Sequence, residues 1–148
     1  MTLIAYKKAS LKYERLKEYE AGMALLGTEV KSLRAKHGSL EGSRVIVRGG
    51  EAFLVGASIP AFQVVNTKDS YDPERPRRLL LSKEQIRELA DAEAKKGLTV
   101  VPIEVYNKEQ KLKIRIAIVR GKGKRDRRED IKAYDAKRDA EREIRGKR

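Results

Sequence analysis

Residues 111–118 alternate between apolar and basic side chains, and this alternation constrains the fold more than any other feature of the chain. The apolar positions are Leu112, Ile114, Ile116 and Ile118, and the basic positions are Lys111, Lys113 and Arg115. Because successive side chains of a β-strand point to opposite faces, the pattern predicts a strand with one face on a core and the other cationic. The preceding run, 98–106, contains Pro102, which lacks an N–H and therefore predicts an edge or bulged strand. The turn between the two strands is expected near residues 107–109.

Two further stretches predict strands earlier in the chain. Residues 43–57 hold two β-rich runs around Gly49 and Gly50, and paired glycines permit the positive φ angles of a two-residue hairpin turn. Residues 13–27 mix Tyr, Leu and Met with charge, and we interpret them as a strand that ends near the last of them. Residues 57–76 hold three of the four prolines and are expected to form a loop.

One helix is expected after the first strand. Thr28 can cap its start, Glu29 suits the positive end of the helix dipole, and Gly38 suits its stop. Val30 and Leu33 are three residues apart and share one face, so we expect both to pack inward.

A second helix is expected after a short strand end at residues 77–81. Ser82 and Gln85 match the capping box, and Leu81 and Ile86 occupy the positions of a hydrophobic staple. The expected buried stripe consists of Ile86, Leu89, Ala90 and Ala94. Gly97 is expected to end this helix.

The expected elements follow the order strand, helix, hairpin, loop, strand, helix and hairpin. Several short antiparallel strands with few helices predict a mainly β protein, and we expect a small closed antiparallel barrel with flanking short helices. Closure would remove exposed strand edges. We interpret residues 1–12 as a basic, partly ordered N-terminal arm, and we expect the barrel to span residues 13–120.

The composition changes at Gly121, where a basic C-terminal tail begins. Residues 121–148 hold 12 Lys and Arg against 7 Asp and Glu, and their large aliphatic residues are Ile131 and Ile144. A stripe this thin buries too little apolar surface to offset the entropy of ordering the segment. We therefore predict a tail that is disordered when free and helical when bound.

Net charge identifies the leading class of partner. The chain carries 35 Lys and Arg against 22 Asp and Glu, a net charge of +13, which favours a polyanion; an anionic membrane surface is a minor alternative. The absence of Cys excludes disulfides and thiolate zinc sites. No apolar run approaches the roughly 18 residues of a membrane span, and the N-terminus lacks the pattern of a signal peptide, so we expect a cytoplasmic protein.

Enzymatic interpretations find little support in the sequence. The single histidine, His37, lies near a helix end without a carboxylate or serine at catalytic spacing. Asp69, Asp72 and Glu74 are carboxylates of the kind that a metal-dependent nuclease uses, but they lie in a loop among basic residues, and solvated loop charges are the favoured interpretation. We expect no catalytic residue, no metal site and no cofactor.

Several basic groups are candidates for contacts with RNA phosphates. Lys31 and Arg34 share the exposed face of the first helix, and Arg77 and Arg78 precede the second helix. Each group alone is more often a solvated surface, but together with a barrel they favour RNA binding. Six tyrosines are available for base stacking, and Tyr13 stands out because it lies beside the basic arm.

Five segments then resemble one family of proteins. They are YEAG at 19–22, GTEVKSLR at 27–34, GEAFLVGA at 50–57, DPERPRRLLLSKEQI at 72–86 and KGLTVVPIEVY at 96–106. The chain is similar in these segments to the small protein B (SmpB) family, the tmRNA-binding proteins of bacterial trans-translation. RGKGKRDRRED at 120–130 resembles the ribosome-binding tail of the family.

The resemblance implies an oligonucleotide-binding (OB) barrel and two RNA partners. A member of this family, one monomer per tmRNA, binds the elbow of the tRNA-like domain and accompanies the RNA into the vacant A site of a stalled ribosome. Its tail then enters the empty mRNA channel next to the decoding centre and folds as a helix.

The resemblance also implies roles for individual residues. Tyr13, Glu20 and Leu80 match positions that contact tmRNA, beside the basic pair Arg77 and Arg78. The ribosome-binding tail residues implied in the same way are Gly121, Lys122, Lys124, Arg125, Asp126, Arg127 and Arg128. The sequence departs from the family at Tyr6 and Leu11, where Asn and His are usual, and at Arg125, where an aromatic residue is frequent.

Two other functions remain as alternatives. One is a structural ribosome-associated OB-fold protein, which would be present on translating ribosomes without tmRNA. The other is a nuclease that depends on Asp69 or Asp72.

Overall fold

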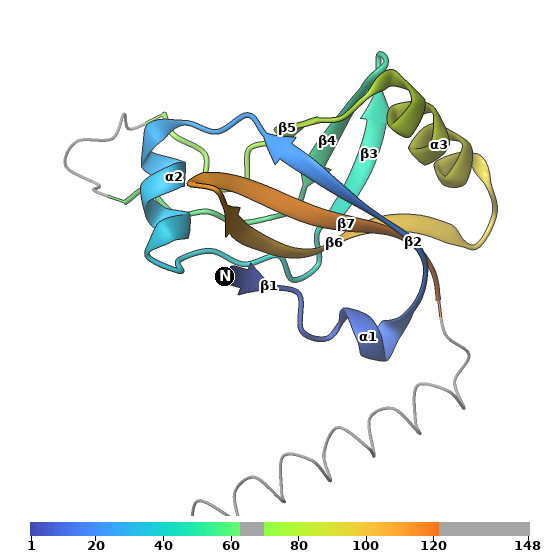
Figure 1. Ribbon diagram of the computed structural model, residues 1–148, viewed down its shortest axis with the longest axis horizontal. Helices are drawn as coiled ribbons and strands as arrows, with labels where there is room; N and C mark the ends of the chain where they lie inside the picture. The colour runs from blue at the N-terminus through green and yellow to red at the C-terminus, as the bar shows by residue number, and fades with distance from the viewer. Residues whose placement is uncertain (63–69, 122–148) are drawn as a thin grey trace, which may run out of the picture.

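A computed structural model describes residues 1–62 and 70–121 as one curled antiparallel sheet with three helices (Figure 1). The strands are β1 (Thr2–Ala5), β2 (Tyr13–Met23), β3 (Arg44–Arg48), β4 (Glu51–Val55), β5 (Arg77–Leu80), β6 (Leu98–Lys108) and β7 (Lys111–Gly121). The helices are α1 (Ala9–Lys12), α2 (Gly27–Arg34) and α3 (Lys83–Ala94). The protein is therefore mainly β, as the sequence predicts.

Three long strands form the centre of the sheet. The strand order is β1-β6-β7-β2-β5-β4-β3, and β6, β7 and β2 have 11 residues each. The register of β6 against β7 shifts between Pro102 and Glu104, so the bulge, one of the two alternatives predicted from the proline, is confirmed. The other alternative is wrong, because β6 lies between β1 and β7 and is not an edge strand. The hairpin of β3 and β4 is also confirmed, with φ angles of 60° at Gly49 and 77° at Gly50.

The predicted separation of β7 into a core face and a cationic face holds only for its first half. Ile114 is buried while Lys113 and Arg115 are partly exposed. Beyond Arg115 both faces are covered, because Ile116, Ala117, Ile118 and Val119 are all buried. The cationic face of the strand is therefore shorter than the sequence alone suggests.

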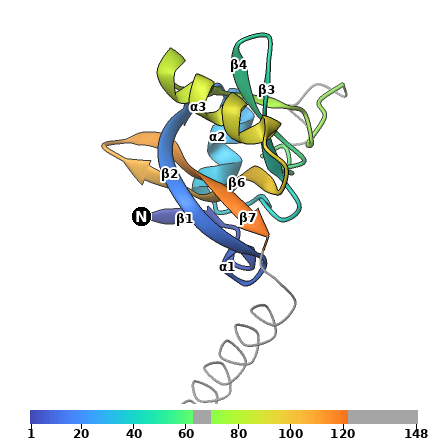
Figure 2. The same cartoon turned by 90° about the vertical axis from the view of Figure 1, so that its right-hand side faces the viewer.

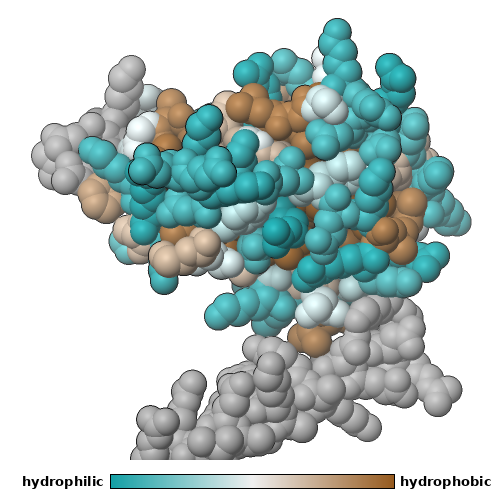
Figure 3. Space-filling model, in the orientation of Figure 1, coloured by the Kyte–Doolittle hydropathy of each residue, from teal (hydrophilic) through white to brown (hydrophobic). Residues whose placement is uncertain are grey.

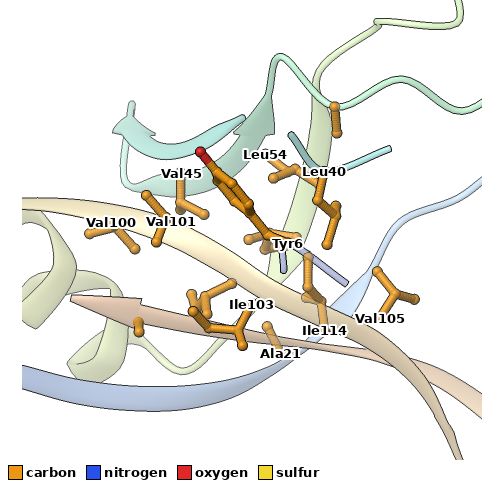
Figure 4. Packing of buried hydrophobic residues seen from close by; sticks show 14 of the residues in the cluster. Tyr6, Ala21, Leu40, Val45, Leu54, Val100, Val101, Ile103, Val105 and Ile114 are labelled. Carbon is orange, nitrogen blue, oxygen red and sulfur yellow. The ribbon is translucent and has the colours of Figure 1, made fainter. Parts of the chain in front are cut away.

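The first twelve residues, which the sequence predicts to be a partly ordered arm, contribute a strand to the sheet and several side chains to the core. β1 pairs with β6, and the backbone N–H of Tyr6 donates to the carbonyl of Ile103 at 2.8 Å. Tyr6 is only 6% exposed and lies among the labelled core side chains of Figure 4. Because the apolar residues Leu3, Ile4 and Tyr6 are few, their pattern is too short to reveal a strand.

The helices keep their predicted places but differ in detail. Ser82 and Gln85 form the expected capping box of α3, and Leu89 and Ala92 are its buried residues, whereas Ala94 is exposed. In α2 the N-cap position belongs to Leu26. Thr28 instead accepts the backbone N–H of Phe62 at 2.8 Å, so the hydroxyl stabilises a distant loop rather than the helix start.

The sheet does not close into the predicted barrel through hydrogen bonds. β1 and β3 are its two ends and share no ladder with each other. β3 approaches β6, but α3 packs against both strands, and the carboxylate of Glu93 accepts the backbone N–H of Val47 at 3.0 Å. Figures 1 and 2 show the curled strands with α3 beside β3. A helix side chain thus satisfies one backbone N–H at the edge of β3 that a closed ladder would pair with another strand.

Candidate nucleic-acid interface

Two rows of polar side chains cross β6, β7 and β2 on the side of the sheet that we call the outer face. The rows of cross-strand neighbours are Glu104–Arg115–Glu20 and Tyr106–Lys113–Gly22. Arg115 donates to Glu104 at 2.8 Å, and its guanidinium carbon lies 5.1 Å from the centroid of the Tyr106 ring. The view with β2 in front is mostly hydrophilic, with smaller apolar patches (Figure 3). The outer face is therefore a mixture of acids, bases and one tyrosine rather than a row of free cations.

Glu20 is held on this face by two donors. The Tyr106 hydroxyl donates to one carboxylate oxygen, and Lys108 Nζ lies 3.2 Å from the other. These two hydrogen bonds, the one from Tyr106 first, lower the pKa of Glu20. Burial and the bond to Glu20 raise the pKa of Tyr106 to about 12. The carboxylate is thus ionised at neutral pH and can accept hydrogen bonds from ribose hydroxyl or base amino groups.

Leu80 lies on the same face of the sheet as Glu20, although the two residues are far apart in sequence. The register pairs Leu80 of β5 with Gly22 of β2, and paired residues share a face. A Cβ atom on Gly22 would lie 3.3 Å from the Leu80 side chain, so glycine leaves room for the leucine. The Leu80 side chain is 50% exposed. The outer face therefore carries both Glu20 and Leu80, two residues that the family resemblance assigns to tmRNA binding.

Arg77 is buried, so the structure contradicts its predicted contact with RNA. The residue is 0% exposed, and its guanidinium donates to Glu29 at 2.8 Å, to the Ala57 carbonyl at 2.9 Å and to the Pro73 carbonyl at 2.8 Å. Because side chains alternate along β5, Arg77 points inward and its neighbour Arg78 points outward. A guanidinium whose donors are used inside the protein cannot reach a phosphate.

Glu29 is the centre of this buried cluster. It accepts hydrogen bonds from Arg75 and Arg77, from the Tyr71 hydroxyl at 3.2 Å, and from the backbone N–H of Leu26 at 2.8 Å. Burial alone would raise the pKa of Glu29, but these hydrogen bonds outweigh it and lower the pKa. The cluster ties α2 to residues 71–77. The sequence predicts only a dipole role for Glu29, since no local pattern reveals partners more than 40 residues away.

The other predicted basic contacts lie on the surface. Lys31 and Arg34 are exposed, and Arg34 donates to the Gln110 carbonyl at 3.0 Å, which ties α2 to the β6–β7 turn. Arg78 is exposed and lies 3.2 Å from a carboxylate oxygen of Glu51. The roles of Lys31, Arg34 and Arg78 in RNA binding stay predictions.

The structure places Tyr13 next to the start of the predicted tail. Tyr13 opens β2 and pairs with Gly121, the last residue of β7. The sequence does not predict this proximity, because the two residues are far apart in the chain. The other predicted tail contacts lie outside the described residues: Lys122, Lys124, Arg125, Asp126, Arg127 and Arg128.

Neither a metal-binding group of side chains nor a membrane-spanning helix occurs among the described residues. Residues 1–62 and 70–121 contain no group of three or more His, Cys, Asp or Glu side chains placed to hold a metal ion. In the same part of the chain, no helix has the length and apolar character needed to cross a membrane.

Comparison with known proteins assigns the family. A family model described as "SmpB protein" matches residues 3–146. The chain belongs to the SmpB family. An SsrA-binding protein of Solidesulfovibrio magneticus is 45% identical over 138 residues, which cover 93% of this chain and 89% of that protein. An SsrA-binding protein of Thermosynechococcus vestitus is 41% identical over 136 residues, covering 92% of this chain and 90% of the relative.

A solved structure supports the SmpB assignment at the level of the fold. The chain matches one described as "tmRNA-SmpB: a journey to the center of the bacterial ribosome" with a TM-score of 0.68 and 36% sequence identity. The match covers 86% of this chain and 93% of the other. The SmpB fold and the described sheet therefore agree over most of both chains.

Proposed function

We propose that this SmpB-family chain binds the tRNA-like domain of tmRNA and brings it to the A site of stalled bacterial ribosomes. The observation that carries the proposal is the match to SsrA-binding proteins over about nine-tenths of both chains. SsrA RNA is tmRNA. The match to a tmRNA–SmpB structure at 36% identity supports the same partner and an association with the ribosome. We infer a binding factor that acts in the cytoplasm without a cofactor, so that the ribosome supplies the chemistry.

The outer face suits the elbow of a folded RNA. Glu20 offers an ionised acceptor, Leu80 offers exposed apolar surface, and Lys113 and Arg78 offer cations at the same face. RNA loops present the complementary groups, namely ribose hydroxyls, unstacked bases and phosphates. We infer that the curled sheet acts as an OB-type platform for this elbow.

Binding assays with matched RNAs test the proposal. We expect the full chain to bind the tRNA-like domain of tmRNA much more tightly than an unrelated hairpin of equal length. If about six phosphates are neutralised, the affinity should fall on the order of 10³-fold between 50 and 200 mM salt. Glu20→Gln keeps the shape of the side chain and removes its charge, so it should weaken specific binding and spare the weak binding to the control hairpin. Equal affinity for both RNAs would contradict the proposal.

The tail is proposed to act on the ribosome rather than on tmRNA. Residues 122–148 are rich in Lys and Arg, and Gly121, which precedes them in the chain, pairs with Tyr13. A chain truncated after Gly121 should therefore bind tmRNA within about twofold of the full chain but fail to support tagging of stalled products. Persistent tagging by the truncated chain would refute this division of roles. A chain found on translating ribosomes in cells without tmRNA would instead favour a structural ribosomal protein.

A further inference from the structure

The turn between β6 and β7 is disfavoured by its own residues. Its two central residues, Glu109 and Gln110, have φ angles of 50° and 69°. Such left-handed angles suit Asn and Gly, whereas longer side chains adopt them at a cost in free energy. Lys108 and Lys111 form the last cross-strand pair before the turn, and like charges directly opposite each other destabilise a sheet. Contacts from outside the hairpin therefore have a large part in holding this turn.

Two contacts from other elements hold the turn. Arg34 lies in the last turn of α2, and its Nη2 donates to the Gln110 carbonyl at 3.0 Å. From β2, the carboxylate of Glu20 accepts hydrogen bonds from Lys108 Nζ at 3.2 Å and 3.4 Å. The first contact fixes a residue within the turn, and the second fixes the residue that immediately precedes it. Arg34 and Glu20 are therefore linked through the three consecutive residues 108–110.

The hydrogen bond to the turn distinguishes Arg34 from its neighbour on α2. Lys31 lies on the same exposed face, and its side chain has no hydrogen bond or ion pair within the described part of the chain. We propose that Arg34 is a positioning residue, which holds the β6–β7 turn so that Lys108 stays on Glu20. The inference rests on the proposed binding of tmRNA, in which Glu20 is an acceptor for the RNA. It replaces the phosphate contact that the sequence suggests for Arg34.

The ionisation of Glu20 reports whether the turn is in place. Tyr106 and Lys108 of β6 donate hydrogen bonds that lower the pKa of this carboxylate, and the charge of Lys113 on β7 lowers it further. Arg115, the cross-strand neighbour of Glu20 on β7, is paired with another carboxylate. If the turn loosens, Lys108 leaves Glu20 and the pKa of Glu20 rises toward its ordinary value of 4.5.

An NMR titration of the Glu20 carboxyl carbon in the free full chain tests this link without RNA. Arg34→Ala should raise the pKa of Glu20 in the same direction as Lys108→Met, which removes the donor itself. Lys31→Ala is the matched control, because it removes a cation from the same face of α2 but no bond to the turn, and it should leave the pKa of Glu20 unchanged. The titration is carried out at about 150 mM salt, where exposed charges farther apart than about 8 Å are largely screened.

A rescue experiment separates support of the turn from the charge of Arg34. Glu109→Asn combined with Gln110→Gly supplies the residue pair that favours two consecutive positive φ angles. Introduced into Arg34→Ala, this pair should return the pKa of Glu20 to that of the unsubstituted chain, although the guanidinium is still missing. Failure of the pair to restore the pKa would refute the inference.

Binding of the tRNA-like domain of tmRNA gives a second readout. Arg34→Ala should weaken binding by about 2- to 5-fold, because a single intramolecular hydrogen bond is lost. The slope of log affinity against log salt should stay the same, whereas loss of a phosphate contact would reduce it by about 0.7–0.9. A reduced slope, or an unchanged pKa of Glu20 in Arg34→Ala, would show that Arg34 is not a positioning residue. If the unsubstituted chain does not bind the tRNA-like domain, the proposed function itself fails, while the NMR titration still tests the role of Arg34.

Discussion

Replacing Glu29 by Gln tests whether the buried charge cluster holds α2 to residues 71–77. Glu29 and Arg77 are both 0% exposed, and Arg77 Nη2 lies 2.7 Å from a Glu29 oxygen. Glutamine keeps the size of the side chain but leaves the Arg77 charge without its counter-charge. Glutamine replaces one carboxylate oxygen by an NH₂ donor, which cannot accept from Arg75 or Tyr71, so the change disrupts the centre of the cluster rather than one surface pair.

The expected loss of stability is large for a domain of this size. Breaking a buried ion pair by removing one partner costs about 3–5 kcal/mol. Arg77 keeps its bonds to the carbonyls of Ala57 and Pro73, so we expect the lower end, about 3 kcal/mol. Native domains are stable by only about 5–15 kcal/mol. Glu51→Gln is the matched control, because its partner Arg78 is half exposed and such surface pairs contribute less than about 1 kcal/mol.

Urea denaturation followed by circular dichroism measures both variants. Glu29→Gln should lower the urea concentration at the midpoint of unfolding without changing the slope of the unfolding free energy against urea concentration. The folded-state pKa of Glu29 lies below its ordinary value of 4.5, so its stabilising charge is fully present above that pH and is lost as the pH falls through the lowered pKa. The difference in the free energy of unfolding between Glu29→Gln and the unsubstituted chain should therefore become smaller in acid. The reasoning would be refuted if Glu29→Gln lowered the free energy of unfolding no more than Glu51→Gln does. It would also be refuted if the difference from the unsubstituted chain did not depend on pH.

Substitutions at three other positions test separate parts of the structure. Tyr106→Phe removes the hydroxyl that most lowers the pKa of Glu20, so Glu20 should take up a proton at a higher pH. As the pH is lowered, the tmRNA affinity of this variant should therefore begin to fall at a higher pH than that of the unsubstituted chain. Binding measured across a pH series checks this, and identical pH profiles would contradict it. Ser82→Ala should cost about 1 kcal/mol in urea denaturation by removing the cap of α3, and Ser82→Asp should restore most of it. Leu89→Ala should cost about 2–5 kcal/mol by the same assay, because the side chain is fully buried, and a cost under about 1 kcal/mol would place Leu89 outside the core.

The sequence predicts well those elements whose determining residues lie close together in the chain. The hairpin turn at Gly49 and Gly50 and the capping box of α3 depend on residues within a few positions of each other, so their chemistry is visible in the sequence. The bulge at Pro102 follows from a missing N–H in the same way. The strand in the first residues escaped detection because β1 has only four residues and obtains its hydrogen bonds from β6.

The candidate site was only partly predictable for the same reason. The family motifs indicate Glu20 and Leu80, but not that a hydroxyl 86 residues away holds the carboxylate of Glu20. Arg77 and Arg78 are adjacent and chemically identical, yet one lies in a buried ion cluster and the other on the surface. Only the direction of each side chain in the folded sheet distinguishes them.

The amino-acid sequence thus determines the kind of protein: a mainly β, strongly basic chain of the SmpB family, in which the turn between β3 and β4 and the start of α3 lie at recognisable residues. Tertiary structure decides which charges are available to a partner. Burial converts Glu29 and Arg77 into an internal ion pair, and cross-strand register brings Glu20, Gly22 and Leu80 onto one face. Both outcomes depend on contacts between residues far apart in the chain, and the free energy of such contacts is set by desolvation and packing that no local pattern contains.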